Sequence, residues 1–231
     1  MYHVSKEALD LFSKNYRQTA VIDVECTDRS KFTITESNIM LGGLTVDRYS
    51  VSGDKIELGS ACAAELALTL DNREGQFEGV KFEGAELYVR IGVKKYDAHR
   101  WEKATVQYVP LGYFTIDEPA RALQTISLTA LDRMVLFDKP VDWSSISFPT
   151  TIGGILDTAC RNCNVPLGDV SPSRPNWDYV IQSAPEDDTT YRQIVQWVAE
   201  LTATCAFVDW DGRLRLSWYE PSTVQISPSE R

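Results

Sequence analysis

The sequence predicts an α+β protein that is mainly β: a β-barrel or sandwich domain, then a small helical insert, then the start of a second β domain. Residues 19–129 contain about seven short stretches with strand character, separated by Gly and Asp turn residues, as in sandwiches and barrels. Two stretches with helical periodicity follow, at residues 151–163 and 187–201. A hairpin pattern at residues 206–218 ends the series.

The amino-terminal part begins with one expected helix and a hairpin. Residues 5–14 place apolar side chains at helical spacing, which predicts a short amphipathic helix. Residues 19–26 alternate between apolar and polar, and residues 31–35 are expected to return as the second arm. The Gly-Gly pair at residues 42–43 is expected to break the chain before a strand at residues 44–51.

The strand pattern is clearest at residues 65–70, where Leu66, Leu68 and Leu70 share one face. Residues 87–93 repeat this pattern. The opposite face of this second strand is expected to present Glu86, Tyr88 and Arg90. Shorter strands are expected at residues 55–58, 106–108, 112–116 and 125–129, with a polar hairpin at residues 94–103.

Two helices are expected in the insert. Residues 151–163 form the first, with Thr150 or Thr151 as its N-cap. The second is capped by Asp188 or Thr189. The apolar face of the second helix is expected to consist of Ile194, Val195, Trp197, Val198 and Leu201.

The last pattern is a hairpin around Asp211-Gly212, a pair that predicts a type I′ turn. Because two strands alone are marginally stable, the hairpin is expected to pair with the first β domain or with strands beyond residue 231. Three domains are expected: residues 1–137, the amino-terminal helix plus the first barrel; residues 138–203, a small helical connecting domain; and residues 204–231, the hairpin that begins or completes a second β domain.

Composition excludes some classes of function. The formal net charge of −10 argues against general affinity for a nucleic-acid backbone, which needs clustered Lys and Arg. No apolar run approaches the roughly 20 residues of a membrane helix, so no membrane insertion is expected. The amino terminus lacks the features of a signal peptide, which predicts synthesis in the cytoplasm. The five cysteines are therefore expected to form no disulfides.

No motif points to catalysis or to a bound cofactor. Cys160 and Cys163 match C-x-x-C, but they fall at the carboxyl end of a predicted helix, where the dipole does not favour a thiolate. We therefore expect ordinary, partly buried thiols. His3 and His99, the two histidines, stand in no nucleophile or metal motif. The sequence predicts no enzyme, no metal and no cofactor.

Aromatic residues in loop-like stretches are candidates for an interface or a sugar platform. Trp101, Trp143 and Trp177 are of this kind, and burial against their own domain is the alternative reading for each. The complete set of candidate interface residues is Tyr96, His99, Trp101, Trp143 and Trp177.

Several segments of the sequence resemble those of a known protein family. They are IELGSACAAELALTL (residues 56–70), GAELYVRIGV (84–93), PLGYFTIDEP (110–119), ISLTALDR (126–133), TTYRQIVQWVAEL (189–201) and VDWDGRLRL (208–216). In their residues and in their order along the chain, these segments resemble the N-terminal half of phage and prophage tail-tip proteins. This is the baseplate-hub or tail-associated family of phages that infect Gram-positive bacteria.

The resemblance implies a fold of paired β-barrels with a small helical domain between them, of which this chain fits the first barrel and the helices. It implies a structural subunit of the virion tail, made in the host bacterial cytoplasm. The implied partners are the chain itself, as a homotrimeric ring around a DNA channel, and the tail tube, distal tail and tape measure proteins. It implies no specific nucleic-acid binding. The alternative function is a carbohydrate-binding β-sandwich that recognises cell-wall glycan through the exposed tryptophans.

Overall fold

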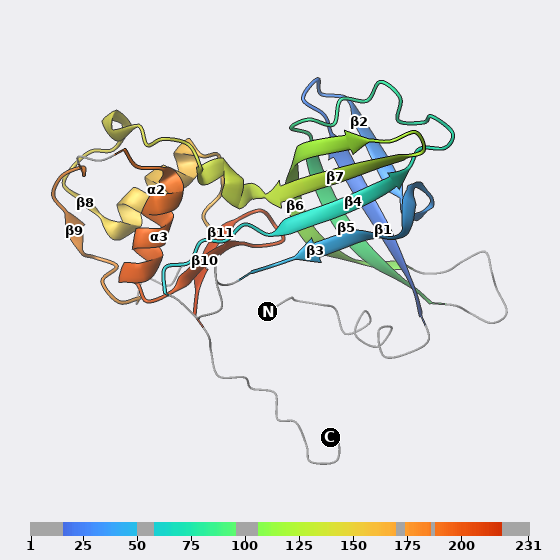
Figure 1. Ribbon diagram of the computed structural model, residues 1–231. Coiled ribbons are helices and arrows are strands. Elements are labelled where there is room, and N and C mark those ends of the chain that lie inside the picture. Colours follow the sequence, from blue (N-terminus) through green and yellow to red (C-terminus); the bar gives the residue numbers. More distant parts are fainter. Residues whose placement is uncertain (1–15, 50–57, 96–105, 170–173, 186–187, 219–231) are drawn as a thin grey trace, which may run out of the picture.

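The computed structural model describes residues 16–49, 58–95, 106–169, 174–185 and 188–218 (Figure 1). Its main feature is one antiparallel sheet of seven strands in the order β2-β1-β5-β6-β7-β4-β3. The strands are β1 (Tyr16–Glu25), β2 (Lys31–Thr35), β3 (Ile39–Asp47), β4 (Glu65–Asp71), β5 (Glu86–Lys95), β6 (Val106–Arg121) and β7 (Thr125–Asp132). The mainly β prediction is therefore confirmed.

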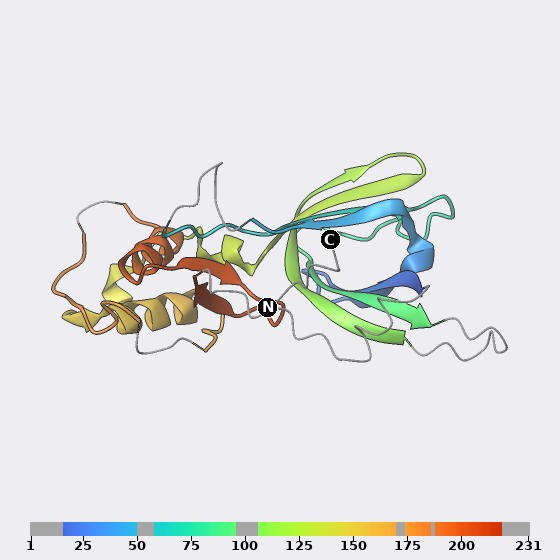
Figure 2. The ribbon, with the colours of Figure 1, turned by 90° about the horizontal axis from the view of Figure 1, so that it is seen from below.

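The sheet curves around its own apolar face, so that opposite ends of the sheet enclose a core (Figure 2). Leu66, Leu68 and Leu70 on β4 lie inside it with almost no exposure, which confirms the alternation predicted there. Aromatic rings contribute to this core. Phe32, Phe77 and Phe82 pack with ring centres 6.0–6.2 Å apart. The interior is therefore filled with side chains.

Two strands differ from the prediction because of bulges. The segments expected at residues 106–108 and 112–116 are one strand, β6, whose register with β5 shifts between Val89 and Arg90. Pro110 has no N–H to donate, and the bulge accommodates it without ending the strand. Likewise β3 starts at Ile39 instead of residue 44, and the Gly-Gly pair forms an irregularity within it.

A second lobe lies beside the sheet (Figure 1). It contains α2 (Ile152–Asn162), α3 (Tyr191–Leu201), the hairpin of β10 (Cys205–Val208) and β11 (Leu214–Ser217), and the short elements η2 (Arg133–Phe137), η3 (Trp143–Ser145), β8 (Thr150–Thr151) and β9 (Val180–Ile181). One turn, η1 (Glu36–Asn38), belongs to the barrel and joins β2 to β3. The helices and the hairpin share one apolar core.

Within the described residues the hairpin is a separate two-stranded sheet and does not join the seven-stranded sheet, while its pairing with strands beyond residue 231 stays a prediction. Single parallel bridges flank it, Ala61 with Ala206 on β10 and Leu167 with Leu214 on β11. Its turn is not type I′ either, because only Gly212 of the central pair has a positive φ, 73°. Asp209 N–H donates to the carbonyl of Arg213 at 2.9 Å, which closes a longer loop.

The helix ends show how local chemistry overrode two expectations. Thr151 caps α2, as predicted, by accepting from Gly154 N–H. The cap of α3 is Thr190, not Asp188 or Thr189, because Gln193 completes a capping box with it. Trp197 and Leu201 do not belong to the buried face of α3; they are 42% and 43% exposed. Tyr191 and Ala199 are buried instead, together with the predicted Ile194, Val195 and Val198.

Three expected segments lie outside the described residues: the helix at residues 5–14, residues 55–57 of the strand expected at 55–58, and residues 96–103 of the polar hairpin.

Candidate functional site

Two arginines, Arg48 and Arg133, join the barrel to the second lobe, and a third, Arg192, makes bonds within the second lobe. The first is Arg48, directly after β3. Its Nη1 donates to the carbonyl of Val208 on β10 at 3.0 Å, and its Nη2 donates to the carbonyl of Leu111 on β6. One guanidinium therefore bonds to the main chain of both lobes, as its fork of five N–H donors allows.

The second joint is Arg133, at the start of η2. Its Nε and Nη2 donate to the carboxylate of Glu86 at 2.9–3.1 Å, and its guanidinium carbon lies 4.1 Å from the centre of the Tyr113 ring. The hairpin turn reaches the same place. A Cβ built on Gly212 would lie 2.7 Å from Arg133 and 3.0 Å from Tyr113, and the φ of Gly212, +73°, also favours glycine there.

The third arginine, Arg192 on α3, makes its contacts within the second lobe. It pairs with both oxygens of Asp138 at 2.5 and 2.7 Å, and it donates to the carbonyl of Ala61 at 3.1 Å. Nearby, Asp132 is only 3% exposed and accepts from Met134 N–H at 2.9 Å. Loss of hydration raises the pKa of the Asp132 carboxyl, although backbone amides, Arg48 and Arg192 oppose the shift. A small pocket of about 160 Å³ lies here, lined by Asp132, Arg48 and residues of β10.

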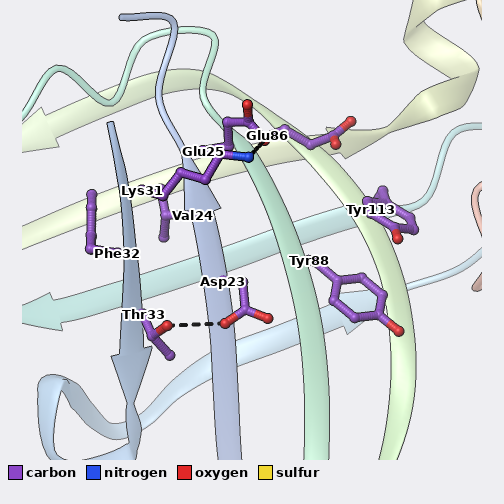
Figure 3. A pocket seen from close by; sticks show the side chains of 9 residues that line it. All are labelled: Asp23, Val24, Glu25, Lys31, Phe32, Thr33, Glu86, Tyr88 and Tyr113. Atoms are coloured by element: carbon purple, nitrogen blue, oxygen red, sulfur yellow. Dashed lines mark hydrogen bonds and ion pairs between the residues drawn. The ribbon is translucent and has the colours of Figure 1, made fainter. Parts of the chain in front are cut away.

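A larger groove of about 360 Å³ lies on the outer face of the sheet (Figure 3). Cross-strand rows of side chains from β2, β1, β5 and β6 build it. In the first row Lys31, Glu25 and Glu86 are register partners, and in the second Thr33, Asp23, Tyr88 and Tyr113 are register partners. Side chains directly opposite on neighbouring strands are close enough to interact, and each row is therefore a chain of contacts.

The tyrosines of the groove are stacked, with ring centres 4.6 Å apart. Arg133 lies over Tyr113, and the guanidinium carbon of Arg90 lies 5.3 Å from the centre of Tyr88. Arg90 also pairs with Asp23, whose other oxygen accepts from Thr33 Oγ1 at 3.1 Å. The sequence places Glu86, Tyr88 and Arg90 on one face of a strand, but the register that brings β1 and β6 beside them is not readable from it.

The predicted interface residues fall in two groups. Tyr96, His99 and Trp101 lie outside the described residues. Trp143 and Trp177 are half-buried and pack against the core of the second lobe. The Trp177 ring covers the second residue of α2, Gly153, where a Cβ would lie 2.8 Å from it. For these two tryptophans the packing agrees with the alternative reading, burial in their own domain.

The surroundings of Cys160 and Cys163 are those of ordinary buried thiols, as predicted. Burial raises the pKa of Cys160 to about 12 and that of Cys163 to about 11. All five cysteines are free. Within the described ranges no three His, Cys, Asp or Glu side chains are placed to hold a metal ion. The described helices are all too short or too polar to cross a membrane.

No protein-family model and no curated protein sequence matches the chain. Solved structures do match. The prophage MuSo2 tail protein of Shewanella oneidensis aligns with a TM-score of 0.53 at 14% identity, over 87% of this chain and 54% of that protein. A tail protein of Neisseria meningitidis aligns with a TM-score of 0.53 at 10% identity, over 88% and 53%. Prophage tail protein gp18 of Listeria monocytogenes aligns with a TM-score of 0.50 at 9% identity, over 84% and 49%. The chain thus shares their fold and spans about half their length.

Proposed function

We propose that the chain is a structural subunit of a phage or prophage tail and that it acts at the tail tip, as part of a baseplate hub. The observation that supports this is the fold, which extends over 84–88% of the chain in three tail proteins from three bacteria. Because these identities are 9–14%, the likeness supports a shared architecture, and the role at the tip remains our proposal. We assign no reaction to the chain.

The contacts between the barrel and the second lobe are consistent with a structural role. A ring subunit transmits position from one neighbour to the next, so its lobes need one fixed orientation. Arg48 donates to main-chain carbonyls of both lobes, and Arg133, where the second lobe begins, donates to the Glu86 carboxylate of the barrel. Such multidentate contacts restrict hinge motion more than single exposed ion pairs do.

The filled barrel also limits where a channel can lie. Because aromatic and aliphatic side chains occupy the barrel interior, DNA would pass between subunits and not through one of them. We propose a homotrimeric ring for this purpose, docked to tail tube, distal tail and tape measure proteins. With a formal charge of −10, an acidic wall around such a channel would let DNA slide without binding.

Light scattering on the purified chain, over a hundredfold concentration range, tests the proposal. A ring of three copies has a mass of about 78 kDa, three times the 26.0 kDa of one chain. We propose Tyr96, His99 and Trp101 as contact residues. Trp101→Ala should then lower the mass at a given concentration, whereas Trp177→Phe, which keeps an aromatic ring on the core of the second lobe, should not. A chain that stays monomeric throughout argues against self-assembly through these residues.

A further inference from the structure

The assembly role proposed above does not use the outer groove, which has the dimensions of a ligand site. Its volume of about 360 Å³ falls in the range of about 300–1,000 Å³ typical of small-molecule sites. Strands supply its lining: β1 forms the floor, β2 one wall, and β5 with β6 the other (Figure 3). Strand positions hold side chains more precisely than loop positions, which favours a preformed site.

The charges of the groove are balanced within the protein. Its carboxylates each pair with a cation: Asp23 with Arg90, Glu25 with Lys31, and Glu86 with Arg133. A charged ligand would add an uncompensated charge and would have to break one of these pairs. A neutral polar ligand does neither, so the groove favours neutral ligands.

The groove keeps hydrogen-bonding capacity for such a ligand. Within the described chain, no hydrogen bond engages the hydroxyl of Tyr88 or of Tyr113. The ammonium of Lys31 and the carboxylate of Glu25 bond to each other through Oε2, which leaves further N–H donors and a second oxygen. Donors and acceptors therefore occur side by side, as they do on a polyhydroxylated molecule.

The tyrosine rings exclude one class of neutral ligand. Tyr113 is covered by Arg133 on one side and by Tyr88 on the other, and Arg90 lies against Tyr88. A flat aromatic ligand would need a free ring face for stacking. An aliphatic ring that is held through its hydroxyl groups needs only the ring edges and the phenol oxygens.

The geometry points to a saccharide-binding groove. A neutral mono- or disaccharide contacts the Tyr88 and Tyr113 hydroxyls on one wall and Asp23, Glu25 and Lys31 on the floor and the other wall. This site is separate from the tryptophans considered above, and it does not depend on ring assembly.

Two-dimensional NMR of the full chain tests the inference with glucose, galactose, rhamnose, N-acetylglucosamine and cellobiose, each titrated separately. We expect a dissociation constant on the order of 1 mM for at least one sugar, because the groove is open and small. The double variant Tyr88→Phe/Tyr113→Phe keeps the stacked rings and removes only the two hydroxyls. It should weaken binding about tenfold, the usual loss for unmade hydrogen bonds.

Tyr108→Phe is the matched control, since Tyr108 is a half-exposed tyrosine of β6 outside the groove lining. It should leave the affinity unchanged. The inference is wrong if none of the five sugars shifts groove resonances at ten times the expected constant. It is equally wrong if the double variant binds as tightly as the wild type. If the double variant alters only the mass in light scattering, the groove is a protein contact and not a sugar site. The NMR outcomes do not decide whether the chain forms a ring.

Discussion

Arg133 and Glu86 form a forked ion pair that links η2 to β5 while the guanidinium lies flat on Tyr113. The Arg133 side chain is only 19% exposed, so the pair is less screened than a surface bridge. We expect Arg133→Ala to lower the free energy of unfolding by about 2 kcal/mol, through the lost ion pair and the lost cation–π contact. Urea denaturation measures this. Arg161→Ala is the control: Arg161 pairs with Asp157 on the α2 surface, and its loss should cost under about 0.5 kcal/mol.

The buried Asp209 carboxylate holds the β10–β11 turn together. It is 2% exposed and accepts from Asp211 N–H and Arg213 N–H, both at 3.0 Å, while its second oxygen pairs with Arg215 at 2.5 Å. Asp209→Ala should therefore destabilise the chain by about 3 kcal/mol, because it leaves buried donors and a cation without partners. Thermal unfolding checks this against Asp211→Ala. That side chain is exposed, so an equal loss in both variants would contradict the argument.

At Gly153, helix propensity and packing have opposite effects on the stability of an alanine variant. Alanine is about 1 kcal/mol better than glycine inside a helix. Here, however, a Cβ would lie 2.8–2.9 Å from three atoms of the Trp177 indole. We expect Gly153→Ala to destabilise the chain by about 1–2 kcal/mol, since the ring must shift from its half-buried position. In a double-mutant cycle with Trp177→Leu the two changes should couple favourably. Stabilisation by Gly153→Ala alone would show that the indole moves freely.

Asp132 predicts a specific pH dependence. The pKa of Asp132 is raised in the folded chain. Between its unfolded-state and folded-state pKa values, the folded state therefore binds more protons than the unfolded state. The contribution of Asp132 to stability is therefore present at low pH and is lost as pH rises from about 4 through the folded-state pKa. Asp132→Asn keeps an oxygen that accepts from Met134 N–H but carries no charge. Relative to this variant, the wild type should become less stable from pH 4 to 7 in urea titrations. A relative gain over that range would refute the assignment.

The cysteines of α2 should be unreactive in the native chain. Cys160 and Cys163 have pKa values of about 12 and about 11, so at pH 8 about one in a thousand or fewer of these thiols is deprotonated to the reactive thiolate. Cys62 is the least buried of the five, and burial raises its pKa too. Iodoacetamide followed by mass spectrometry should therefore label Cys62 first and leave Cys160 and Cys163 unmodified. Rapid labelling of either α2 thiol before unfolding would overturn the inert reading.

The elements that sequence predicted well are those whose burial follows a simple period. The leucines of β4 recur at every second residue, as in a strand, and the apolar residues of α2 recur at helical spacing. Both elements begin and end within a residue or two of the predicted positions. The groove was not predictable in this way. It depends on β1 lying beside β5 with Glu25 opposite Glu86, and such register is decided by pairing between distant segments.

The missed details have local causes. Pro110 indicates a strand end, but a bulge lets β6 continue past it. Trp197 has the hydrophobicity of a core residue and the helical position of a surface residue, and its position decides its exposure. The cap of α3 was displaced by one residue because Gln193, three positions on, selects Thr190.

The second lobe draws on chain segments that are synthesised far apart. Ala61, which precedes β4, shares a core with Leu216 on β11. On the ribosome, the segment around Ala61 emerges long before the hairpin that covers it. The second lobe therefore cannot complete its core until nearly all of the described chain has been made, and its folding is slowed by the entropy of closing that long loop. Until then Ala61 remains in water, and the barrel is expected to fold first.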